Sequence, residues 1–134
     1  MQKSFVKEFK LYCKKKNLDV NSHQIKLIKI LEEYYKLNYK SFISKILSKK
    51  NYKKGFYLYG DVGVGKTMIL DFFFNLVEGK KLKLHFNEFM LSFHDFIHQS
   101  KDKNDENKLS KFVKKLKSKA KLIYFDEFQV TNIV

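Results

Sequence analysis

The first third of the chain carries apolar residues at helical spacing. Within residues 1–20 they recur every three or four positions among lysines, which predicts a short amphipathic helix. Asn21 followed three positions later by Gln24 is a capping-box pattern, and it predicts the start of a second amphipathic helix. A third helical piece is predicted over residues 41–47, before a polar connector at 48–54. The positions that define the first two helices are Phe5, Phe9, Tyr12, Ile25, Ile28, Leu31 and Tyr35.

The next part of the chain alternates between strand and helix patterns. Residues 56–59 form an apolar, aromatic run bounded by glycines, which predicts a buried strand. Residues 68–78 are long and apolar enough for a buried helix, and Gly79 is placed to end it. Residues 81–86 alternate polar and apolar side chains, the period of a second strand.

The last part of the chain adds two helices and a strand. Asn87 is a candidate cap for a helix over residues 88–98, and the polar stretch 101–108 predicts a solvated loop. A further amphipathic helix over residues 109–118 leads to a strand with four apolar residues at 122–125. The order β-α-β-α-α-β predicts an α/β fold with a parallel sheet and flanking helices. We place its domain at residues 55–134, preceded by a helical N-terminal region at 1–54.

Between the first predicted strand and its helix lies a glycine-rich octapeptide that matches G-x-x-x-x-G-K-[ST], the Walker A pattern of P-loop NTPases. The glycines let backbone N–H groups curl around an anion, toward which the helix directs its positive dipole end. Lys66 can reach the outer phosphates, and the Thr67 hydroxyl can hold Mg²⁺. A chance glycine-rich turn is the alternative, and the flanking strand and helix argue against it. The predicted nucleotide-binding residues are Gly60, Asp61, Val62, Gly63, Val64, Gly65, Lys66, Thr67 and Met68.

Two adjacent carboxylates end the last predicted strand. We expect Asp126, as a Walker B acid, to complete Mg²⁺ coordination with Thr67, and Glu127 to act as the catalytic residue that polarises the attacking water. The alternative is a pair of charges where a strand emerges into solvent. The upstream loop favours the site, and the second acid favours ATP hydrolysis over phosphate transfer to a hydroxyl. The sequence therefore predicts that Lys66 and Thr67 converge with the two acids on one magnesium-bound ATP.

The composition of the chain bears on which partners and which cellular compartment we expect for it. The formal net charge is +14, which invites a nucleic-acid interpretation, yet all 28 basic residues are Lys. Arg is preferred for bidentate phosphate and guanine contacts, so we favour a lysine-solvated surface over nucleic-acid binding. The single Cys13 excludes an intrachain disulfide and fits a reducing compartment. Neither a leader peptide nor an 18-residue apolar run is evident, so we expect a cytoplasmic protein with at most peripheral membrane contact.

Three stretches are distinctive in combination: residues 55–68, 85–90 and 125–131. Together they resemble one protein family, the ZapE-type (Afg-like) AAA+ ATPases, a bacterial cell-division ATPase and its mitochondrial relatives. The resemblance implies a AAA+ fold, ATP and Mg²⁺ as cofactors, a hydrolase that couples ATP turnover to remodelling of protein partners such as the division machinery, and a homo-oligomer. Asn87 stands where the family commonly has His, and Asn132 where Asp is usual. Both departures concern partners or regulation rather than ATP binding.

The resemblance also implies a longer protein. Members of the family continue past the acidic strand with a sensor strand, an arginine finger and a helical lid, whereas this chain stops at Val134 and contains no Arg. We therefore expect the N-terminal part of an ATPase domain, incomplete after the acidic strand, and assign hydrolysis to the complete protein. Two alternatives stay open: a helicase-loader-like ATPase acting on DNA, and a non-catalytic fragment whose helices serve as an interaction surface.

Overall fold

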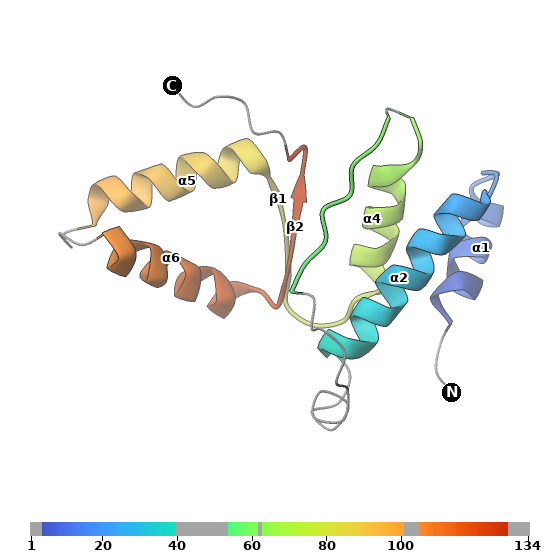
Figure 1. Ribbon diagram of the computed structural model, residues 1–134, viewed down its shortest axis with the longest axis horizontal. Coiled ribbons are helices and arrows are strands. Elements are labelled where there is room, and N and C mark those ends of the chain that lie inside the picture. The colour runs from blue at the N-terminus through green and yellow to red at the C-terminus, as the bar shows by residue number, and fades with distance from the viewer. Residues whose placement is uncertain (1–3, 40–53, 62, 101–104, 129–134) are drawn as a thin grey trace. The chain divides into compact units, whose positions relative to one another are not determined.

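A computed structural model of the chain describes residues 4–39, 54–61, 63–100 and 105–128. They belong to two compact units, Met1–Leu76 and Val77–Val134, which are described separately. The predicted division between residues 54 and 55 stays a prediction. The helices and strands are α1 (Phe5–Lys15), α2 (Ser22–Tyr39), α4 (Lys66–Leu76), β1 (Lys81–His85), α5 (Phe86–Gln99), α6 (Asp105–Lys119) and β2 (Leu122–Asp126) (Figure 1).

The core of the first unit consists largely of aromatic side chains from its helices. Phe9 of α1 is fully buried, and its ring meets Phe72 of α4 edge-to-face with the centroids 5.0 Å apart. The ring of Phe5 of α1 lies beside that of Phe73 of α4, with the centroids 6.2 Å apart. Helix α2 packs against both α1 and α4, and it buries Ile28. The predicted amphipathic helices are therefore confirmed, and their apolar faces cover the helix that follows the glycine-rich loop.

Helix α2 begins with the capping box that the sequence predicts. The backbone N–H of Asn21 donates to Gln24 Oε1 at 3.2 Å, and the backbone N–H of Gln24 donates to Asn21 Oδ1 at 2.9 Å. This reciprocal pair satisfies N–H groups that the first turn of a helix otherwise leaves without an intrahelical acceptor. It also fixes the positions of both side chains at this end of the helix.

The predicted buried strand over residues 56–59 is wrong. These residues form no strand, and Tyr57 and Tyr59 are 66% and 80% exposed. A strand needs a hydrogen-bonded neighbour, and the described part of the chain contains no strand that pairs with this segment. Its start is held by α2 instead: the Tyr34 hydroxyl donates to the Lys54 carbonyl at 3.2 Å, and the Tyr34 ring packs against Phe56.

The second unit contains a parallel pair of strands joined by two helices. β1 and β2 pair in register from Lys81 opposite Leu122 to His85 opposite Asp126. Helices α5 and α6 form the connection between them and contact each other, and Phe93 of α5 packs on the buried Phe112 of α6. The predicted parallel arrangement is confirmed for these two strands.

Several predicted boundaries shift. Helix α5 begins at Phe86 with His85 at its N-cap, so the predicted cap at Asn87 is wrong: the chain turns into the helix directly from β1. Helix α6 begins at Asp105, four residues inside the predicted loop, because acidic residues are favourable in the first turn of a helix. The predicted helix at 41–47 lies outside the described residues. None of the described helices has the length and hydropathy needed to cross a bilayer.

Candidate nucleotide-binding site

The glycine-rich loop adopts a conformation that favours glycine at three positions. Gly60, Gly63 and Gly65 have φ angles of 147°, 85° and 83°, which side-chain-bearing residues rarely adopt. Helix α4 starts directly after Gly65, whose carbonyl accepts the Ile69 N–H at 3.0 Å. The predicted passage from loop to helix is therefore confirmed, and the first N–H groups of α4 lie at the end of the loop.

Lys66 folds back over the loop. Its ammonium Nζ donates to the carbonyl oxygens of Gly60 at 2.7 Å and Asp61 at 2.5 Å. Thr67 is exposed on the first turn of α4, and Met68 is half-buried behind it. Val62 lies outside the described residues. A phosphate group is suited by the groups present here: left-handed glycines, an ammonium and a helix N-terminus. The residues present therefore fit ATP.

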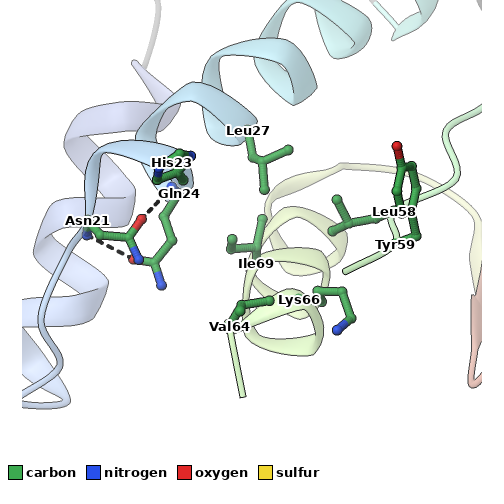
Figure 2. A pocket seen from close by; sticks show the side chains of 9 residues that line it. All are labelled: Asn21, His23, Gln24, Leu27, Leu58, Tyr59, Val64, Lys66 and Ile69. Atoms are coloured by element: carbon green, nitrogen blue, oxygen red, sulfur yellow. Dashed lines mark hydrogen bonds between the residues drawn. The ribbon is translucent and has the colours of Figure 1, made fainter. Parts of the chain in front are cut away.

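A pocket lies beside the loop, and no pattern in the sequence predicts it (Figure 2). Its volume is about 190 Å³. The first turns of α2, residues 58 and 59, the loop and α4 all contribute to its wall. The lining residues are Asn21, His23, Gln24, Leu27, Leu58, Tyr59, Val64, Lys66 and Ile69. The capping-box motif was visible in the sequence, but its proximity to a loop about forty positions later depends on how α2 packs against α4.

The acidic pair lies at the carboxyl end of β2, as predicted. Asp126 Oδ2 is 3.3 Å from Lys83 Nζ, and Asp126 Oδ1 accepts the Glu127 backbone N–H at 3.2 Å and the Tyr124 hydroxyl at 3.4 Å. The Lys83 ammonium also lies 4.9 Å from the centroid of the Tyr124 ring. These contacts orient the Asp126 carboxylate at the carboxyl end of β2.

Glu127 follows in a left-handed conformation with φ of 53°, which is uncommon for a residue other than glycine. It is exposed. A carboxylate on such a turn projects beyond the strand instead of continuing the ladder. The loop belongs to the first unit and the two acids to the second, so their convergence on one ATP stays a prediction.

Comparison with known proteins places the loop and the acids in a family context. The family model described as AFG1-like ATPase matches residues 13–134. "Lactation elevated protein 1 homolog B" of Danio rerio is 38% identical over 96 residues, which covers 64% of this chain and 19% of that protein. "Cell division protein ZapE" of Escherichia coli K12 is 35% identical over 81 residues, 60% of this chain and 21% of that protein. No solved structure matches significantly. The chain thus spans about a fifth of the curated relatives it matches.

Proposed function

The chain belongs to the AFG1-like ATPase family, and from this premise we propose that residues 60–68 bind the phosphates of ATP together with Mg²⁺. The observation that carries the proposal is the conformation of the loop. Its glycines are left-handed, and the Lys66 ammonium donates hydrogen bonds to the carbonyl oxygens of Gly60 and Asp61. A phosphate oxygen would be a stronger partner for the Lys66 ammonium than these neutral carbonyl oxygens, because it carries a negative charge that attracts the cation.

The roles of the loop residues follow from this arrangement. The glycines allow backbone N–H groups to face the phosphates, and Gly65 starts α4 so that its first N–H groups and positive dipole end do the same. Lys66 exchanges its carbonyl acceptors for phosphate oxygens. Thr67 would present its hydroxyl as a ligand for Mg²⁺, and the bound metal would neutralise negative charge on the phosphates.

The acidic pair supplies the second part of the proposal. Asp126 would contribute a carboxylate to Mg²⁺ coordination, for which it leaves its ion pair with Lys83. Glu127 would act as the general base that orients and deprotonates the attacking water. Its exposure and left-handed turn support this role, because a catalytic base has to extend beyond the strand end toward substrate.

For the complete protein we propose ATP hydrolysis coupled to the remodelling of partner proteins in a homo-oligomer. The support is the match to the E. coli protein named for cell division, so division proteins are the first partners to test. Reduction of ATP turnover by Glu127→Gln in the complete protein, with ATP binding retained, would place Glu127 in the hydrolytic step. Unchanged turnover would remove it from that role.

The direct test of nucleotide binding is a comparison of unfolding with and without Mg-ATP. ATP at 100 times its Kd should add about 2.7 kcal/mol to the stability of the wild-type chain. Lys66→Ala should abolish this gain, whereas Lys10→Ala, which removes the same charge from an exposed position on α1, should retain it. Absence of any gain in the wild-type chain would overturn the proposal and favour a non-catalytic role.

A further inference from the structure

The chain turns sharply directly after β2, at Glu127. This residue has a φ of 53°, a left-handed conformation that is unfavourable for a residue with a side chain. Such a conformation persists where the surrounding contacts hold it. One of these contacts comes from the preceding residue, because Asp126 Oδ1 accepts the Glu127 backbone N–H at 3.2 Å. The same carboxylate is the proposed ligand of Mg²⁺, so a second contact that does not involve Asp126 would keep the turn when the metal binds.

Phe128 makes a second contact of this kind. Its ring packs on the ring of Phe86, with the centroids 4.2 Å apart and the planes inclined by 49°. Aromatic rings in close contact are attractive beyond the apolar area that they bury. Phe86 is the first residue of α5 and follows His85, which pairs with Asp126 where the two strands end (Figure 1). The ring contact therefore joins the chain beyond Glu127 to the end of the neighbouring strand.

The geometry of a strand links this ring contact to the conformation of Glu127. Successive side chains of a strand lie on opposite faces, so a continued β2 would place Phe125 and Phe128 on opposite faces. Instead both rings contact Phe86, that of Phe125 edge-to-face with the centroids 6.0 Å apart. The left-handed turn at Glu127 thus brings Phe128 to the face on which Phe125 lies. The energy of the ring contact offsets the cost of the left-handed φ.

The partners of Phe128 belong to an aromatic cluster that is anchored in the core of the second unit. Phe86 and Phe125 both contact Phe89 of α5, at centroid distances of 6.2 and 4.7 Å. Phe89 in turn packs on Phe112 of α6, which is 6% exposed. Phe128 itself is 40% exposed. Its truncation would therefore release the turn and leave the buried rings in contact.

We propose that Phe128 is a positioning residue for Glu127: its ring on Phe86 keeps the turn left-handed and holds the Glu127 carboxylate beyond the end of β2. This role rests on the proposed function of Glu127 as the general base. A general base has to lie within hydrogen-bond reach of the water that it deprotonates, and a misplacement of about 1 Å can reduce a rate about 10²-fold. A phenyl ring exchanges no proton, so Phe128 affects hydrolysis through the position of Glu127.

The first test measures the Glu127 turn itself, by NMR of the full chain without nucleotide. A positive φ brings the amide and α protons of one residue close together, so Glu127 should show a strong intraresidue NOE in the wild-type chain. Phe128→Ala should weaken this NOE, and Phe128→Tyr, which keeps the ring, should retain it. Leu91→Ala is the matched control and should also retain it, because Leu91 lies on α5 of the same unit and is 66% exposed.

Two results of this test would overturn the inference: a weak Glu127 NOE in the wild-type chain, or an unchanged one in Phe128→Ala. Far-UV circular dichroism verifies that each variant keeps its helices. Phe128→Leu, a smaller truncation that also removes the ring, replaces Phe128→Ala if the helices are lost.

The second test measures ATP turnover by the complete protein. Phe128→Ala should lower kcat about tenfold, which is less than the roughly 10²–10⁴-fold that a general base contributes, and leave the Kd of ATP unchanged. In a Glu127→Gln background the same substitution should have no further effect, because Phe128 acts through Glu127. An equal loss in both backgrounds would overturn the inference and leave the proposed function intact. If the complete protein hydrolyses no ATP, or if Glu127→Gln leaves turnover unchanged, the proposed role of Glu127 and this inference are both wrong.

Discussion

Replacing Phe9 with Ala tests whether α1 is an integral part of the unit that carries the glycine-rich loop. The Phe9 side chain is 0% exposed, and its ring meets Phe72 of α4 edge-to-face at 5.0 Å. Truncation of a fully buried Phe to Ala costs about 3–5 kcal/mol, of which the edge-to-face pair accounts for about 0.5–1.5 kcal/mol. Because a small domain has only about 5–15 kcal/mol of stability, we expect the substitution to remove a large part of it.

Hydrogen exchange measures this loss where it matters, on the backbone amides of α4 in the full chain. The most protected α4 amides should lose about 3 kcal/mol or more of their free energy of opening in Phe9→Ala. Leu11→Ala is the matched control, because Leu11 is on the same helix and is 53% exposed, so it should change α4 little. A loss below about 1 kcal/mol in Phe9→Ala, or equal losses in the two variants, would refute the packing of α1 on α4.

Three further predictions address the loop, the cap and the thiol. Gly65→Ala should weaken ATP binding in a titration, because a left-handed φ costs a side-chain-bearing residue about 1–2 kcal/mol and the new β-carbon crowds Gln24. Gly55→Ala is the control, since no atom lies within 4 Å of its β-position, and equal ATP affinities of the two variants would contradict the account. Asn21→Ala should cost about 1 kcal/mol and speed hydrogen exchange in the first turn of α2, whereas unchanged exchange would show that the capping box is dispensable. Burial raises the pKa of the Cys13 thiol above its ordinary value, so the folded chain should react slowly with a thiol reagent, and rapid labelling would contradict this. The stability contributed by the neutral thiol should be complete below the ordinary thiol pKa and decrease as pH rises past it.

Features encoded by local chemistry could be predicted from the sequence. The capping box at Asn21 and Gln24, the loop that opens α4 at Lys66 and the strand that ends at Asp126 all occur where their patterns placed them. Each depends on neighbours within a few positions: a side chain three residues along, glycines at fixed offsets, or a run of apolar residues. Such signals survive in any tertiary context that allows the element to form.

Features that depend on distant partners could not be predicted. Residues 56–59 have the composition of a buried strand, but a ladder requires a neighbouring strand, and the described residues give it none. The approach of Gln24 to Gly65 likewise results from the packing of α2 against α4, which no local pattern encodes. At α6 the prediction missed helix where it exists. The polar stretch predicted as a loop contains acidic residues that suit a helix N-terminus, and α6 begins there at Asp105.

The central claim is that the loop at Lys66 and Thr67 and the acids at Asp126 and Glu127 serve one metal–nucleotide complex. Cleavage by bound Fe²⁺ tests it most directly. Fe²⁺-ATP replaces Mg-ATP, and added hydrogen peroxide and ascorbate generate hydroxyl radicals at the metal, which cut the nearby backbone. The account predicts two cuts, one beside Thr67 and one beside Asp126, both suppressed by excess Mg²⁺ and both absent in Lys66→Ala. Cleavage beside Thr67 alone would contradict the convergence of the two sites.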